Sequence, residues 1–203
     1  LVATQQSHWT IDDLAADYAQ LARWARDAGA DCIETNFSCP NVSTVDGDLY
    51  RHPCDAGLCA QRVREAIGTT PYIIKVGHLK SDTEAAELVE AVAPWCDALA
   101  TTNSVALPVR DSHDQLLFDG ARRGICGAGI REASIAQTQQ LTQLIEQRGL
   151  KTQVIGVGGA SGGGHGPWQI PYGALVPLKV DNLLAAGRCI SAELRMADLV
   201  RLI

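Results

Sequence analysis

Four short runs rich in apolar and β-branched residues are the feature that most constrains the fold of this chain. They cover residues 32–35, 72–76, 96–101 and 153–157, and helical patterns separate them. Strands that alternate with helices are typical of a parallel sheet, because the helices return the chain to the same edge and cover the sheet. We therefore expect an α/β protein.

The helical segments carry start and stop signals. Thr10, followed by two aspartates, predicts an N-cap for a first helix that ends at Gly29. The sequence S-D-T-E at residues 81–84 predicts a capping box at the start of another helix. Two further helices are expected over residues 56–67 and 132–148. The strands and helices therefore alternate along most of the chain.

Polar residues follow two of the predicted strands. The sequence N-F-S-C-P-N occupies residues 36–41, directly after the first strand, and Asn103 and Ser104 follow the third. Pro40 cannot continue a strand ladder, so the first cluster is expected to leave the sheet as a loop. A second loop of about twenty residues, rich in Asp, Gly and Arg, is expected after Ser104; loops of that length are usually functional or disordered. We expect chemistry at this end of the sheet.

Composition excludes several classes of function. The 203 residues carry a net charge of −6 without a basic run, which argues against nucleic acid as a partner. No apolar stretch approaches the roughly 20 residues of a membrane span, and no signal pattern is present, so we expect a cytoplasmic protein. The seven cysteines include no C-x-x-C pair, which argues against disulfides and against a metal site. Cys59 is expected to pack in the core.

The composition changes after the fourth strand. Residues 160–167 are rich in glycine and are expected to form a linker or turn. We therefore divide the chain into a domain over residues 1–161, a glycine-rich junction over residues 162–167 and a tail over residues 168–203.

Five motifs, in order, resemble those of dihydroorotate dehydrogenases and of the related dihydropyrimidine dehydrogenase domain. The first is N-F-S-C-P-N. The others lie at residues 71–75, 102–104, 124–127 and 155–159. In the fourth motif, Arg123 stands where the family has a glycine. The tail, over about residues 168–194, instead resembles the C-terminal part of an FAD-dependent oxidoreductase.

The resemblance implies an FMN-binding (β/α)8 TIM barrel, of which this chain would hold about four βα units. It also implies an oxidoreductase that acts on the CH–CH group of a pyrimidine and transfers a hydride to flavin N5. The expected partner is a small-molecule pyrimidine, with either a homo-oligomer or an electron-transfer subunit besides. The residues do not distinguish an orotate-type from a uracil-type substrate.

The resemblance assigns the acid/base role to a loop cysteine. Cys39 lies within the first motif and is the first candidate, since a thiol with a pKa near the working pH can take up the substrate proton. Cys54, just before the following helix, is the alternative, because dihydropyrimidine-type relatives carry the active cysteine later in this loop. Either thiol could instead be structural.

Amide and hydroxyl side chains are the candidates for substrate binding. Asn36, Asn41, Asn103 and Ser104 could pair with the N–H and carbonyl edge of a planar pyrimidine. The alternative for Asn41 is turn chemistry beside Pro40.

The resemblance also assigns cofactor contacts to a lysine, an asparagine and four glycines. Lys75 interrupts an apolar strand and is expected near the flavin ring; the alternative is a lysine that extends to solvent at a strand end. The expected FMN-binding residues are Lys75, Asn103, Gly124, Gly127, Gly158 and Gly159. The glycines would admit a phosphate to backbone N–H groups, although each could equally form an ordinary turn.

Two alternatives from other functional classes stay open. A truncated half-barrel could be non-catalytic and act only by association, since open sheet edges tend to pair with other chains. The chain could also be a fragment of an FAD-dependent oxidoreductase. Outside the motifs, Arg122 and Arg123 are expected to be a solvated surface pair, with binding of an acidic substrate as the alternative. His78 is a minor candidate for the polarity of the site.

Overall fold

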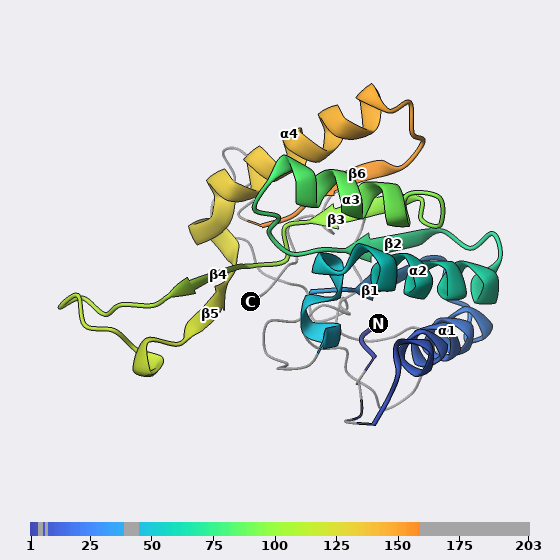
Figure 1. Ribbon diagram of the computed structural model, residues 1–203, viewed down its shortest axis with the longest axis horizontal. Coiled ribbons are helices and arrows are strands. Elements are labelled where there is room, and N and C mark those ends of the chain that lie inside the picture. The colour runs from blue at the N-terminus through green and yellow to red at the C-terminus, as the bar shows by residue number, and fades with distance from the viewer. Residues whose placement is uncertain (4–5, 7, 39–44, 159–203) are drawn as a thin grey trace, which may run out of the picture.

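A four-stranded parallel sheet forms the centre of the molecule (Figure 1). The computed structural model describes residues 1–3, 6, 8–38 and 45–158. The strands lie in the order β1–β2–β3–β6, with bounds Ile33–Asn36, Tyr72–Lys75, Ala98–Thr101 and Gln153–Gly156. Strands β2, β3 and β6 lie inside the predicted runs, and β1 is shifted from its run by one residue. The expected α/β class with a parallel sheet is therefore confirmed.

Four α-helices accompany the sheet in chain order (Figure 1). They are α1 (Ile11–Asp27), α2 (Pro53–Ile67), α3 (Asp82–Val92) and α4 (Arg131–Gln147). Because the strands lie side by side in chain order, right-handed crossovers place α2, α3 and α4 on the same face of the sheet. This leaves the opposite face to strand side chains and to the loops that follow the strands.

Side-chain caps fix where two of the helices begin. At α1 the Thr10 hydroxyl accepts a hydrogen bond from the Asp13 N–H, and the Asp13 carboxylate accepts one from the Thr10 N–H, as in a capping box. At α3 the Ser81 hydroxyl accepts from the Glu84 N–H at 3.2 Å. The Glu84 carboxylate, however, accepts from the N–H of Lys80 rather than from that of Ser81. Only half of the predicted second capping box therefore forms.

The hydrophobic core lies between the sheet and the helices. Its largest fully buried side chains come from all four α-helices, the first three strands and the segments that follow strands: Leu14, Tyr18, Ile33, Phe37, Leu49, Val63, Tyr72, Ile74, Val76, Leu88, Leu99 and Leu141. Cys59 of α2 is fully buried among them, so its predicted packing role is confirmed. The core thus fixes the strand ends from which the polar loops leave.

The long loop expected after Ser104 is instead an antiparallel hairpin. Strand β4 (Val105–Pro108) pairs with β5 (Arg122–Ile125), and a 3-10 turn, η2 (Phe118–Gly120), lies between them. The hairpin projects away from the main sheet (Figure 1). Three large apolar side chains near its far end are exposed: Leu116, Leu117 and Phe118. Two further 3-10 segments, η1 (Val45–Arg51) and η3 (Gly127–Ile130), lead into α2 and α4.

The first residue of the chain extends the sheet beyond β1. The Leu1 amine donates to the carbonyl of Glu34 at 2.6 Å, and the Leu1 carbonyl accepts from the N–H of Asn36 at 2.9 Å. This pair of bonds on either side of Thr35 is the pattern of a parallel ladder. The β1 edge of the sheet is therefore partly occupied by the chain itself.

Candidate active site

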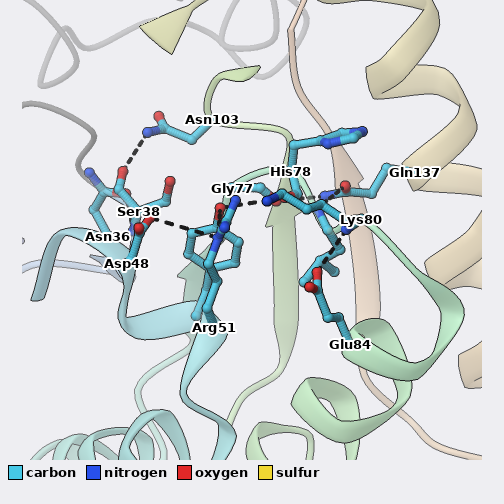
Figure 2. A network of polar contacts seen from close by, with 12 residues as sticks. Asn36, Ser38, Asp48, Arg51, Gly77, His78, Lys80, Glu84, Asn103 and Gln137 are labelled. Atoms are coloured by element: carbon cyan, nitrogen blue, oxygen red, sulfur yellow. Dashed lines mark hydrogen bonds and ion pairs between the residues drawn. The ribbon is translucent and has the colours of Figure 1, made fainter. Parts of the chain in front are cut away.

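The polar residues predicted at the ends of β1 and β3 come together around Ser38 (Figure 2). The Asn36 side-chain oxygen accepts a hydrogen bond from the Ser38 N–H at 3.2 Å. The Asn103 amide nitrogen donates to the Ser38 carbonyl at 2.5 Å. All three residues and the adjacent Ser104 are buried. Two carboxamides, one from the end of β1 and one from the segment after β3, are thus held within one small cluster.

Backbone contacts across the strand ends hold this cluster in place. The Phe37 N–H donates to the Lys75 carbonyl, and the Asn103 N–H donates to the Val76 carbonyl. Gly77 permits a very close approach, because a Cβ there would lie 2.5 Å from the Ser38 hydroxyl and 2.6 Å from the Tyr50 ring. No residue other than glycine fits without displacing one of them.

Lys75 is buried at the carboxyl end of β2 and forms an ion pair with Glu34 of β1. A buried ammonium needs such a partner, because desolvation without compensation is costly. The Lys75 side chain is 4% exposed and that of Glu34 is 35% exposed. A positive charge therefore lies within the sheet beside Asn36, to which Lys75 is directly opposite in register.

Two of the predicted glycines, Gly127 and Gly158, lie in neighbouring turns. Gly158, after β6, has φ of +101°, and a Cβ there would lie 2.7 Å from the Ile130 side chain of η3. Gly127, at the start of η3, has φ of +66°, while Gly124 lies in β5 opposite Ala106. The end of β6 thus lies against the turn that leads into α4, with backbone conformations that favour glycine.

The cysteines differ sharply in environment. Cys54 lies in the first turn of α2 and is exposed. Burial raises the pKa of Cys59 and of Cys96 to about 12, which removes both thiols as bases near neutral pH. Cys39 lies outside the described residues, as do Asn41 and Gly159. Of the predicted site, the described residues therefore bring together Asn36, Asn103 and Ser104 around Ser38, with Lys75 opposite Asn36 in register.

Sequence reasoning missed the residue that ties the strand-end loops to α4. Gln137 is buried, and its side-chain oxygen accepts from the Leu79 N–H at 2.7 Å (Figure 2). Its amide nitrogen donates to the Gly77 carbonyl at 2.7 Å and to the Thr101 hydroxyl. The position of Gln137 one helical turn before the buried Leu141 was the available signal. Glu34, the partner of Lys75, was missed as well.

Neither a metal site nor a membrane span is found in the described part of the chain. No group of three or more His, Cys, Asp or Glu side chains there could hold a metal ion. None of the helices formed by those residues is both long enough and apolar enough to cross a bilayer.

Comparison with known proteins relates most of the chain to dihydroorotate dehydrogenases. It is 34% identical over 155 residues to the dihydroorotate dehydrogenase of Dictyostelium discoideum, a match that covers 72% of this chain and 41% of the relative. It is 29% identical over 152 residues to the catalytic subunit of the dihydroorotate dehydrogenase B (NAD(+)) of Solidesulfovibrio magneticus, covering 72% and 47%. The chain thus spans less than half the length of these relatives. The resemblance to dihydroorotate dehydrogenases that the motifs predict is confirmed.

The fold and the tail each have a match of their own. The crystal structure of the Eimeria tenella DHODH in complex with ferulenol superposes with a TM-score of 0.59 at 13% identity, over 79% of this chain and 46% of that one. The described part of the chain therefore shares the fold of that structure. A family model described as FAD dependent oxidoreductase matches residues 150–202, in agreement with the resemblance stated for the tail.

Proposed function

We propose that this dihydroorotate dehydrogenase-like chain is part of an FMN-dependent oxidoreductase that acts on the CH–CH group of a pyrimidine. One observation carries the proposal: Asn36 and Lys75 lie opposite each other at the carboxyl ends of β1 and β2, and Asn103, just after the adjacent β3, bonds to Ser38 at the same end of the sheet. That end is where barrel enzymes place their chemistry. An ammonium and two carboxamides supply the charge and the hydrogen-bonding edges that a flavin and a planar pyrimidine require.

The proposed architecture is a partial (β/α)8 barrel over residues 1–161. Strands β1, β2, β3 and β6 would be four consecutive barrel strands, with α2, α3 and α4 on the outer face. Glu34 and Ile73, which are neighbours in register, are only half-buried, as expected for an inner face that further strands would cover. The junction over residues 162–167 and the tail over residues 168–203 lie outside the described residues.

The residues of this chain fit an FMN site. Lys75 would hold the ring end of the cofactor through its buried positive charge, with Asn103 beside it. Gly124, Gly127 and Gly158 would let backbone N–H groups approach the phosphate, since the last two already have positive φ. Gly159 would join them. When bound, FMN supplies the hydride acceptor, which no amino-acid side chain offers.

Substrate binding is assigned to the amide cluster. Asn36 and Asn103, held by Ser38, would pair with the ring N–H and carbonyl groups of the pyrimidine, with Ser104 and Asn41 completing the set. Because Asn36 and Asn103 are buried, a ligand that leaves their amides unpaired would bind poorly. The cluster would therefore select a planar ring with alternating donors and acceptors.

Removal of the substrate proton is assigned to a cysteine thiol of the loop after β1. Cys39, three residues after Asn36, is the proposed acid/base group, and Cys54 at the start of α2 is the alternative. Replacing each cysteine by alanine distinguishes them in the full-length parent enzyme, assayed by the rate of flavin bleaching on mixing with dihydroorotate. The Cys39→Ala variant should bleach at least about a hundredfold more slowly at pH 7, because general-base catalysis contributes 10²–10⁴-fold. A Cys39→Ala enzyme with the full rate and a slow Cys54→Ala enzyme would reverse the assignment.

An FMN titration of the purified chain tests the proposal directly. Quenching of flavin fluorescence should saturate at micromolar concentrations, and the Lys75→Met variant should weaken binding about tenfold or more through loss of the buried charge. Lys151→Met, at an exposed position before β6, is the matched control and should bind like the wild type. Wild-type protein that fails to quench FMN would contradict the assignment of a cofactor site to this chain.

The match over residues 150–202 favours a second candidate function for the tail. Under this proposal the C-terminal segment derives from an FAD-dependent oxidoreductase. Chromatography of the flavin released from the purified protein tests it: FMN supports the first proposal and FAD the second. A colourless protein that self-associates would favour a half-barrel that acts only by association.

A further inference from the structure

A cavity lined by basic side chains adjoins the cluster formed by Asn36, Ser38 and Asn103. It measures about 490 Å³ and lies between η1, the segment after β2 and the base of the β4–β5 hairpin. Ser38 and Ser104 line it on the side of the cluster, so the two regions are continuous. Basic side chains from three separate segments line the remainder: Arg51, His78, Lys80 and Arg122.

Positive charge exceeds negative charge in this cavity. Against one lysine and two arginines, Asp48 is the one carboxylate among the described lining residues. Its closest oxygen lies 3.8 Å from the Arg51 Nε, and the Asp48 side chain is 60% exposed. Such a partner neutralises little of the field, because exposed ion pairs are weak. The cavity therefore retains a net positive potential.

The two arginines are held by contacts that leave donors for a ligand. The Arg51 Nε donates to the Tyr50 hydroxyl at 2.9 Å, and the guanidinium lies over the Tyr50 ring with 5.3 Å to its centroid. Among the described contacts, none uses the terminal nitrogens of Arg51. Arg122 donates through one terminal nitrogen to the Ala106 carbonyl at 2.6 Å. Two guanidinium groups are thus placed in advance, which lowers the entropy cost of binding an oxyanion.

The pKa of His78 depends on this positive charge. His78 lines the same cavity as Arg51 and belongs to the polar network drawn in Figure 2. The pKa of His78 is lowered first by partial burial and then by the positive charge of Arg51, with a smaller contribution from Lys80, while Glu84 opposes the shift. The pKa of His78 should therefore change when an anion binds in the cavity.

We propose that this cavity is an anion-binding subsite, which takes the carboxylate or phosphate group of a small molecule between Arg51 and Arg122. The subsite is distinct from the glycine turns assigned to the FMN phosphate, and it does not depend on flavin chemistry. Its continuity with Ser38 and Ser104 means that a ligand could place its anionic group here and a polar ring in the amide cluster. Two phosphate-like or carboxylate-like oxygens match the fork geometry of a guanidinium.

Calorimetric titration of the purified chain tests the subsite, with inorganic phosphate and succinate as separate probes. Sodium chloride keeps the ionic strength constant, so that general charge screening does not vary. At least one probe should bind saturably with a millimolar or lower Kd, and the tighter probe identifies the preferred oxyanion. Arg51→Gln and Arg122→Gln should each weaken that binding about tenfold.

Arg123→Gln is the matched control for Arg122→Gln. It removes the same charge from the adjacent residue of β5, where the guanidinium lies over the Phe118 ring rather than in the cavity. Its affinity for the probe should equal that of the wild type. Absence of saturable binding to the wild type, or an equal loss in all three variants, would overturn the proposal.

A spectroscopic measurement provides an independent test. The bound anion should raise the pKa of His78, followed by proton NMR across pH 5–8, because a nearby negative charge favours the imidazolium. Its resonance is identified by loss of the signal in His78→Gln. A His78 pKa that does not change at saturating probe would also overturn the proposal.

Discussion

Replacing Gln137 by leucine should destabilise the fold through the loops that carry the site. The side chain is 2% exposed and bonds to three buried groups: the Leu79 N–H, the Gly77 carbonyl and the Thr101 hydroxyl. The Thr101 hydroxyl keeps a second partner, the Thr102 hydroxyl at 3.1 Å. Leucine therefore leaves two buried backbone groups, the Leu79 N–H and the Gly77 carbonyl, without their hydrogen-bond partner.

The expected loss follows from those two groups. Each buried, unsatisfied backbone group costs about 1–3 kcal/mol, which gives about 2–6 kcal/mol in total. Burial of the leucine side chain returns about 1–2 kcal/mol. Taking the midpoints of these two ranges, about 4 and about 1.5 kcal/mol, the free energy of unfolding should fall by about 2–3 kcal/mol. With an m value of about 2 kcal/mol/M in urea, the unfolding midpoint should drop by about 1–1.5 M.

Urea unfolding followed by circular dichroism is the assay, and Gln139→Leu is the control. Gln139 lies on the same helix but is exposed, so the same chemical change there should alter stability by less than about 0.5 kcal/mol. An equal midpoint for the two variants would refute the reasoning that the Gln137 bonds hold the loops.

Gln137→Glu tests the same network through pH. One carboxylate oxygen can still accept from the Leu79 N–H, but the other then faces the Gly77 carbonyl without a proton to donate. Protonation restores the donor, so the folded state should raise the pKa of this carboxyl above its unfolded value of about 4.3. Stability should be fullest below that pH and be lost as the pH rises through the folded pKa. A variant equally stable at pH 4 and pH 8 would contradict this.

Two further predictions concern neighbouring parts of the sheet. Gly77→Ala should lower stability and weaken binding of the anion probe together, because its Cβ would overlap Tyr50, which lines the cavity. Gly156→Ala, whose Cβ would meet its nearest atom at 3.4 Å, should lower stability far less. The midpoints of urea unfolding compare the two variants. Although partial burial alone would raise it, the pKa of Asp97 is lowered overall by a hydrogen bond from the first N–H of β2 and by Arg64. Its contribution to stability should therefore be present above about pH 4 and be lost as the pH falls further, and Asp97→Asn should flatten that acid limb of the stability curve.

The main sheet was predictable because its signals are local. The runs at residues 32–35 and 72–76 need only apolar, β-branched residues bounded by helix caps, and β1 and β2 form there. The β4–β5 hairpin was not predictable in this way. Residues 105–108 and 122–125 lack alternation of apolar and polar side chains, and their pairing joins segments separated by thirteen residues. Long-range pairing of that kind is set by the surrounding structure, so the sequence pattern alone predicted a loop.

The partner of Lys75 illustrates what a sequence leaves undetermined at a site. Burial of a lysine in an apolar strand implies a counter-charge, but many carboxylates of this chain could supply it. The parallel register places Asn36 directly opposite Lys75, and Glu34 lies two residues earlier on the same face of β1. Once the register is known, Glu34 follows as the nearest acidic candidate. The ion pair and the amide cluster therefore depend on one register, and a slip by a single residue would move both Asn36 and Glu34 to the opposite face.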